Sequence, residues 1–284
     1  MLKKIKKSQV GKLMSVRKSD SHKGENGRVL IIGGSLDYYG APLLAGLGAL
    51  NSGADKVHLL VPECNFDCSR SIYADFFVRK YKGDYFNLEA AKDAVEYAKL
   101  RCDSVVSGPG LSTHEGVLEA VQYVVENLSI PTVIDADAIK VLKRIEKFPL
   151  DQTVVLTPHQ NEFRELVDRD VTVKAGETQS VVLLRSVAMD LHVNILLKSS
   201  VDFVTSDEGY MEINDTGNAG MTAGGTGDVL AGMVGTFLAQ GMSGYDSARA
   251  AAYFNGFAGD RLRKVSGYNF SASDLAAKLK EVVG

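Results

Sequence analysis

Short apolar runs alternate with stretches of helical periodicity along most of the chain. The apolar runs predict strands over residues 28–34, 56–61, 103–107, 131–135, 153–156 and 194–198, followed by a hairpin over residues 201–213. The helical periodicity predicts helices over residues 41–52, 88–100, 115–127, 138–145, 178–191, 227–240, 245–260 and 273–282. Because short strands alternate with longer helices, the pattern predicts βαβ units. The expected fold class is α/β, with a mainly parallel sheet covered by helices on both faces.

Glycines and polar residues recur where the predicted strands end. They occupy residues 33–35, 108–110, 135–137 and 157–159, and Lys198 ends a further strand. In parallel sheets that are covered by helices, ligands bind beyond the carboxyl ends of the strands. The sequence therefore predicts a binding site along this edge of the sheet.

Composition and charge exclude several classes of protein. The 284 residues include 32 Lys and Arg against 35 Asp and Glu, a formal net charge of −3, and 45% of them are hydrophobic. Such a chain folds, and its near-neutral charge argues against a broad nucleic-acid surface. The longest apolar run, residues 41–50, is shorter than the ~20 residues that a membrane span requires. We therefore expect no nucleic-acid partner and no membrane span.

Residues 1–24 form a basic segment that lacks the apolar stretch of a secretory signal, so we expect a cytoplasmic protein. A solvated tail or a clamp on a neighbouring subunit is favoured for this segment over RNA or lipid binding. The three cysteines are odd in number and belong to no Cys/His cluster, which favours reduced thiols. No linker or repeat divides the rest of the chain, so residues 25–284 are predicted to form a single domain.

The most informative motif is Ala-Gly-Gly-Thr-Gly-Asp at residues 223–228, directly before an apolar helix. Consecutive glycines let the backbone turn its N–H groups inward, and the start of the helix adds a positive partial charge. Together they predict an anion hole for a phosphate, formed by Gly225, Thr226 and Gly227. Asp228 then lies in the first turn. A carboxylate there can simply cap the helix, but its place after the glycines favours a base that faces the phosphate.

The segment at residues 218–228 resembles the signature of the ADP/ATP-dependent NAD(P)H-hydrate dehydratases of the ribokinase-like superfamily. Segments at 33–35 with 40–41, at 108–111, at 133–138 and at 156–162 agree with that family in the same order. The match spans roughly residues 25–282. The resemblance implies a ribokinase-like three-layer αβα fold, with the helices on both faces of the sheet.

The resemblance also implies an activity. Members of this family restore NADH or NADPH from the S epimer of a hydrate (NADHX or NADPHX), in which water has added at C6 of the nicotinamide ring. Hydroxide is a poor leaving group, so the dehydration is coupled to hydrolysis of ADP or ATP. Transfer of a phosphoryl group to the C6 hydroxyl would make it a good leaving group. Mg²⁺, a separate NAD(P)HX epimerase and a homotetrameric assembly are expected on the same basis.

Matching positions assign site residues by the same resemblance. Asp228 corresponds to the base, which also contacts the hydrate. The family's hydrate-binding positions correspond to Ala41, Gly110 and His159. Glu162 stands where the family keeps an acidic residue that holds Mg²⁺ through water. Without the resemblance, His159 is equally explained as a loop residue and Glu162 as a cap of the next helix.

The nucleotide positions of the family correspond to Lys198, Ser199, Ser200, Val201 and Asp202, together with Gly227. Two departures affect this region: Ser199 replaces the more usual glycine, and residues 160–161 replace the more usual Pro-Gly. Asp135 and Asp137 end a strand near the same edge. They are interpreted as structural residues or as residues that support the site from behind, with contact to magnesium as the less favoured alternative.

Three other functions are weighed against this one. A ribokinase-like kinase for a vitamin-like alcohol would share the fold and Asp228, but the segments at 108–110 and 157–159 favour the hydrate. A dinucleotide dehydrogenase is disfavoured because residues 33–35 lack the Gly-x-Gly-x-x-Gly spacing. A non-catalytic nucleotide-binding regulator would not need the acid at Asp228.

Overall fold

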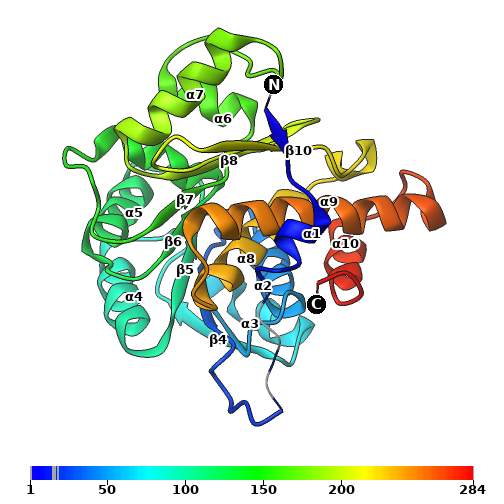
Figure 1. The fold of residues 1–284 in the computed structure, drawn as a ribbon. Helices are drawn as coiled ribbons and strands as arrows, with labels where there is room; N and C mark the ends of the chain where they lie inside the picture. The colour runs from blue at the N-terminus through cyan, green and yellow to red at the C-terminus, as the bar shows by residue number, and fades with distance from the viewer. Residues whose placement is uncertain (1, 15–16, 18, 284) are drawn as a thin grey trace.

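The computed structural model describes residues 2–14, 17 and 19–283. It contains a ten-stranded sheet in the order β1-β10-β9-β8-β7-β6-β5-β2-β3-β4 (Figure 1). The strands are β1 Lys3–Lys4, β2 Arg28–Ile32, β3 Lys56–Pro62, β4 Phe76–Tyr81, β5 Ser104–Ser107, β6 Thr132–Ile134, β7 Val154–Leu156, β8 Asn194–Leu197, β9 Asp202–Thr205 and β10 Met211–Asn214. From β8 to β4 the neighbours are all parallel, whereas β9 is antiparallel to both β8 and β10.

The chain changes direction across the sheet between β2 and β5. Strands β3 and β4 are added on one side of β2, and β5 to β8 follow on the other. At such a switch point the two flanking loops diverge and leave a crevice at the carboxyl ends of the strands. The loops touch at one point, where the Gly34 amide donates to the Pro109 carbonyl at 2.9 Å. The switch point therefore lies within the edge that the sequence pattern predicts as a binding site.

Helices cover both faces of the sheet (Figure 1). One layer, which we call the glycine layer, contains α2 Gly40–Asn51, α8 Thr226–Ala239, α9 Gly244–Ser266 and α10 Ala272–Leu279. The opposite layer, which we call the alanine layer, contains α4 Leu88–Arg101, α5 Glu115–Asn127, η1 Ala136–Arg144, α6 Gln160–Val167 and α7 Thr178–Asp190. The predicted three-layer α/β fold is confirmed.

Strand residues alternate between the two layers. In β2, Val29 and Ile31 face the glycine layer, while Leu30 and Ile32 face the alanine layer, and all four are fully buried. Side chains on neighbouring strand positions point to opposite faces, so a strand that is covered on both faces must be apolar throughout. This requirement explains why the central strands read as unbroken apolar runs.

The helix and strand at one edge of the sheet were not predicted, nor were several short elements, and one predicted helix differs in type. Helix α3 Glu63–Ile72 and strand β4 lie at one edge of the sheet, where only Phe76 and Tyr81 of β4 are buried, so neither element shows a clear apolar pattern. The segment predicted as a helix over 138–145 is the 3₁₀ element η1.

The described part of the N-terminal segment packs on its own chain. Strand β1 pairs with β10, and the short helix α1 Lys7–Val10 contacts α9. Ile5 and Val10 are buried, so a solvated tail does not describe these residues. Within the described residues, none of the helices is both long and apolar enough to cross a membrane.

Candidate active site

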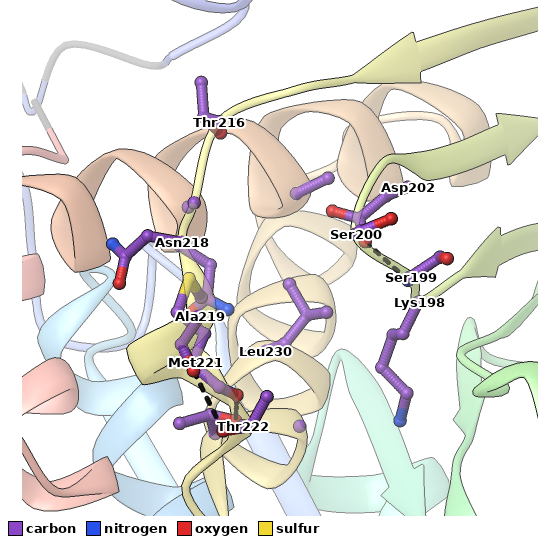
Figure 2. A pocket seen from close by; sticks show the side chains of 16 residues that line it. Lys198, Ser199, Ser200, Asp202, Thr216, Asn218, Ala219, Met221, Thr222 and Leu230 are labelled. Carbon is purple, nitrogen blue, oxygen red and sulfur yellow. Dashed lines mark hydrogen bonds between the residues drawn. The ribbon is translucent and has the colours of Figure 1, made fainter. Parts of the chain in front are cut away.

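A cavity of about 440 Å³ opens beside the start of α8. Figure 2 shows the turn after β8 on one side, the segment before α8 on the other, and the first turns of α8 between them. The lining residues come from these three segments and from α9: Lys198, Ser199, Ser200, Asp202, Thr216, Gly217, Asn218, Ala219, Met221, Thr222, Thr226, Gly227, Leu230, Ala252, Asn255 and Gly256.

The first turn of α8 presents free backbone donors. Gly225 caps the helix with φ 93°, in the left-handed region that favours glycine. The Thr226 hydroxyl donates to the Met221 carbonyl at 2.7 Å and fixes the preceding loop. Within the described residues, the amides of Gly227 and Asp228 have no acceptor. Unpaired amides at a helix start favour an anion, so this turn is suited to a phosphate.

Lys198 places a positive charge next to this turn. Its ammonium lies 2.9 Å from Oδ1 of Asp135. It also lies 3.2 Å from the position that a Cβ on Gly227 would occupy. A side chain at position 227 would therefore press on the ammonium, and glycine leaves room for the close approach.

Three carboxylates share this single ammonium. Burial raises the pKa of Asp228 to about 7, and the charges of Asp135 and Glu162 add to the rise while Lys198 opposes it. Burial also raises the pKa of Glu162, against the attraction of Lys198. Burial alone would lower the pKa of Lys198, but the nearby carboxylates outweigh it and the pKa is raised. The site thus holds a charged lysine and a carboxyl group that titrates near neutral pH.

His159 and Glu162 form a reciprocal cap at the start of α6. Nδ1 of His159 accepts from the amides of Asn161 and Glu162, both at 3.1 Å. Glu162 accepts from the His159 amide at 2.8 Å, and its other oxygen lies 3.1 Å from Nε2 of the same histidine. Because Nδ1 accepts, Nε2 carries the ring proton. The capping interpretation is therefore correct for Glu162, and His159, which was interpreted as a loop residue, is the N-cap of the same helix. The half-exposed imidazole also remains open to a ligand.

These residues fit a magnesium ion only through water. Both carboxylate oxygens of Glu162 are engaged by His159. In the described part of the chain, no group of three or more His, Cys, Asp or Glu side chains could hold a metal ion. Mg²⁺ keeps several waters and commonly uses substrate phosphates as ligands, so an excess of carboxylates beside a phosphate position suits it.

Ala41 and Gly110 lie side by side at the switch point. A Cβ on Gly110 would stand 3.1 Å from the Cβ of Ala41. Leu44, one turn further along α2, lies against Gly225 at the start of α8. The structure therefore connects the switch point to the anion hole through a single helix.

The predicted nucleotide residues are only partly brought together. Lys198, Ser199, Ser200 and Asp202 line the cavity, whereas Val201 packs against the alanine-layer core. Asp202 holds the turn itself, because it accepts from the Ser199 amide and from the Asn214 side chain, both at 3.0 Å. Burial raises the pKa of Asp202 to about 6.

Two walls of the cavity were not predicted as site residues. One is the segment at 216–222, which lies in or next to the recognised signature. The other is a face of α9 with small residues four apart, Ala252 and Gly256, next to Asn255. Oδ1 of Asn255 is buried and has no partner within the described residues. The small-residue spacing in an apolar helix is the signal that could have indicated this wall.

Comparisons with known proteins agree with one another. A family described as NAD(P)H-hydrate dehydratase matches residues 29–281. The ADP-dependent (S)-NAD(P)H-hydrate dehydratase of Cenarchaeum symbiosum is 33% identical over 280 residues, which cover 98% of this chain and 96% of that protein. The bifunctional NAD(P)H-hydrate repair enzyme Nnr of Methanothermobacter thermautotrophicus is 36% identical over 94% of this chain. The match covers 51% of that enzyme, so the chain spans about half the length of the first curated relatives it matches.

Solved structures extend the comparison. The ADP/ATP-dependent NAD(P)H-hydrate dehydratase of Bacillus subtilis, co-crystallised with ATP and Mg²⁺, superposes with a TM-score of 0.86 at 26% identity, covering 99% of this chain and 97% of that one. The hydroxyethylthiazole kinase of Pyrococcus horikoshii gives a TM-score of 0.64 at 15% identity, covering 98% of this chain and 93% of that one. The kinase therefore supports the fold alone.

Proposed function

The chain belongs to the NAD(P)H-hydrate dehydratase family, and we propose that it returns the S epimer of NADHX or NADPHX to NADH or NADPH with hydrolysis of ADP or ATP. One observation carries the proposal. Asp228 lies in a helical turn whose amides are free, and the Lys198 ammonium lies against Gly227 of the same turn. This arrangement brings together a base, an anion hole and a cation, which phosphoryl transfer to an alcohol requires.

The cavity beside α8 would bind the nucleotide. Its walls at 198–202 and 216–222 enclose the space for the nucleoside, and the free amides of Gly227 and Asp228 mark the place of the terminal phosphate. Lys198 would stabilise the negative charge that spreads over the transferring group. Ala41, Gly110 and His159 would hold the hydrate on the other side of Asp228.

Asp228 would act as the base. As the C6 oxygen attacks the terminal phosphorus, its proton moves to the carboxylate and the bond to the rest of the nucleotide breaks. The ring nitrogen then pushes out phosphate with the C6–O bond electrons, and loss of a proton from C5 restores the double bond. A pKa of about 7 suits this role, because a base works best with a pKa near the operating pH.

Mg²⁺ is proposed as the metal cofactor. It would supply charge neutralisation to the nucleotide phosphates. Glu162 would hold it through water, since both of its oxygens already accept from His159. In this arrangement Glu162 fixes the imidazole and orients water at the same time.

The remaining partners are also proposals. A functional link to an NAD(P)HX epimerase is supported by relatives that are bifunctional repair enzymes. We further propose a cytoplasmic homotetramer. The kinase alternative rests on fold likeness alone, so the hydrate remains the favoured substrate.

The test is a repair assay with Asp228→Asn. Hydrated NADH is incubated with protein, Mg²⁺ and ADP or ATP, and recovery of reduced-nicotinamide absorbance is followed. We expect the variant to lose ~10³-fold or more in kcat and still bind nucleotide. Recovery at wild-type rate by the variant, or recovery without nucleotide, would contradict the proposal.

A matched control is Asp274→Asn. Asp274 also lies in a first helical turn, but its carboxylate accepts from Ser271 at the start of α10. Full activity is expected in this variant, because its acid serves only as a cap.

A further inference from the structure

Asp135 is buried at the carboxyl end of the sheet, and its side chain is 2% exposed. It directly follows β6, Thr157 directly follows β7, and Lys198 directly follows β8. These strands are neighbours, so residues far apart in the chain meet here. Oδ1 of Asp135 accepts from the Thr157 hydroxyl at 2.7 Å and from the Lys198 ammonium at 2.9 Å.

The ion pair with Asp135 fixes the flexible side chain of Lys198. A free lysine samples many rotamers, and ordering it costs conformational entropy. Here the ion pair holds the ammonium next to Gly227, where the free amides lie. Thr157 in turn holds the carboxylate, so the lysine is placed before any nucleotide arrives. Preorganised charge of this kind lowers the barrier because it need not rearrange during the reaction.

The charge of Asp135 also acts on Asp228. Three other charged groups face Asp228: Asp135 after β6, Lys198 after β8 and Glu162 on α6. Among the three, Asp135 opposes ionisation of Asp228 most strongly, and Lys198 favours it. One buried carboxylate thus touches the cation of the site and acts electrostatically on its base.

We propose that Asp135 is a positioning residue, which with Thr157 holds Lys198 over the first turn of α8 and whose negative charge also acts on Asp228. The inference rests on the proposed function, because it assigns the turn to the transferred phosphoryl group. It adds a role for a residue that touches neither substrate.

The experiment begins with Asp135→Asn, which keeps the shape and removes the charge. We expect kcat to fall about tenfold to a hundredfold, because a displaced ammonium no longer meets the transferring group. The affinity for ADP, measured by calorimetry without hydrate, should change less than about threefold. Loss of the Asp135 charge favours ionisation of Asp228, and this effect is larger than the opposing effect of moving the Lys198 ammonium away. The acid limb of the pH–rate profile should therefore move to lower pH.

Two further variants separate positioning from folding. Asp135→Glu retains the charge, and its acid limb should stay at the wild-type pH. Lys198→Met removes the group that is positioned, so adding Asp135→Asn to it should cost little more in kcat. If Asp135 were only structural, Asp135→Asn would instead lower the folded fraction and reduce the rate by the same factor at every pH. The decreases in kcat caused by Asp135→Asn and by Lys198→Met would then multiply in the double variant.

Different results of these experiments would overturn the inference and the proposed function. An unmoved acid limb in a folded Asp135→Asn protein, or independent losses in the double variant, would overturn the inference. Should the wild type fail to repair hydrate, the proposed function fails instead. The nucleotide-dependent phosphatase rate with water as acceptor, measured in the same variants, would then still test whether Asp135 positions Lys198.

Discussion

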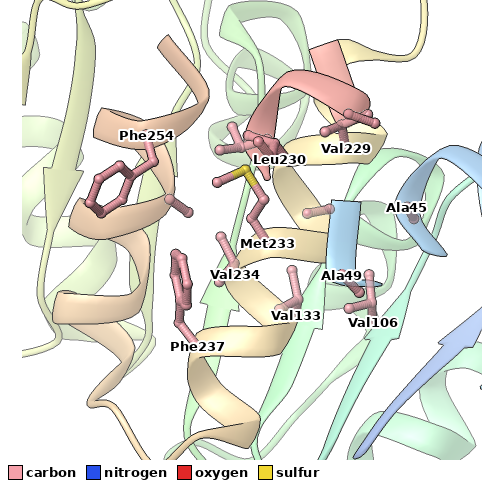
Figure 3. Close-up of a cluster of buried hydrophobic side chains, with 14 of the residues drawn as sticks. Ala45, Ala49, Val106, Val133, Val229, Leu230, Met233, Val234, Phe237 and Phe254 are labelled. Atoms are coloured by element: carbon pink, nitrogen blue, oxygen red, sulfur yellow. The ribbon is translucent and has the colours of Figure 1, made fainter. Parts of the chain in front are cut away.

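The two helical layers pack against the same sheet in different ways. In the glycine layer, α2 and α8 meet backbone to backbone: a Cβ on Gly232 would overlap the Ala45 carbonyl, and one on Gly48 would overlap that of Val229. Figure 3 shows Ala45 and Ala49 of α2 lying close to α8, with Phe254 of α9 on the other side. In the alanine layer, α4 and α5 pack through ordinary side chains such as Ala91 and Val121.

The difference matches what each layer contributes to the site. Backbone N–H groups keep a fixed direction only if the helix that carries them is held in place. Helix α8 carries the free amides of Gly227 and Asp228. The alanine layer contributes His159 and Glu162 at the start of α6, where a side-chain cap holds them. The closely packed glycine layer therefore supplies the free backbone amides together with the Asp228 side chain, and the alanine layer supplies His159 and Glu162.

The difference in packing between the two layers can be tested by making a glycine-to-alanine substitution in each of them. Gly232→Ala places a methyl group on backbone atoms that cannot move separately, so we expect a loss of about 3 kcal/mol or more in the free energy of unfolding. Gly116→Ala on α5 meets open space, and should stabilise by about 0.5 kcal/mol through helix propensity. Urea unfolding measures both. Equal changes in the free energy of unfolding would show that the two layers do not differ in how closely their helices pack.

A smaller effect is expected from the buried charge in the glycine layer. Burial raises the pKa of Asp228 from 3.8 to about 7, so its ionisation destabilises the fold progressively as the pH rises through that range. Asp228→Asn should increase the free energy of unfolding by about 2 kcal/mol above pH 7, roughly half of the full linkage because some solvent reaches the side chain. The gain should shrink as the pH falls toward 4.

Asp274→Asn is again the matched control for this pH series. Hydrogen bonds from Ser271 lower the pKa of Asp274, so its ionised form stabilises the fold. The control should show no gain at any pH. A gain in Asp228→Asn that persists unchanged at pH 4 would contradict the electrostatic cause.

The smallest change in stability is expected from removing the His159 cap of α6 in the alanine layer. His159→Ala removes the acceptor for two amides and should cost about 1 kcal/mol of stability. His159→Asn keeps a capping oxygen and should restore most of that stability. Both variants should raise KM for the hydrate, since both lose the imidazole. A normal KM in His159→Asn would show that the ring serves only the helix.

Sequence reasoning succeeded where a residue's environment is local. The helix at 115–127 and the strand beginning at residue 28 follow from periodicity, because their apolar faces meet a covered sheet. The adjacent glycines before a helix likewise indicated the turn at the start of α8 where backbone amides are free, and the assignment of that turn as an anion hole stays a prediction. The edge strand β4 was missed because half-exposed positions erase the apolar pattern.

The sequence alone did not show which side chains from distant segments contact one another. Asp135 and Lys198 are 63 residues apart and meet only because β6, β7 and β8 are neighbours. Asp135 was accordingly interpreted only as structural or as supporting the site, and the sequence did not show that its partner is Lys198. The α9 wall of the cavity, with Asn255, likewise depends on how a later helix crosses the sheet.

The position of the amino-terminal strand has a practical consequence for anyone producing this protein. Lys4 pairs with Asp215 at 2.6 Å, immediately before the cavity wall that begins at Thr216. Lys7 lies over the Phe257 ring, one residue beyond Gly256 on the opposite wall. Purification tags and truncations at this end are therefore expected to perturb contacts next to two walls of the cavity, so we expect a carboxy-terminal tag to disturb affinity measurements less.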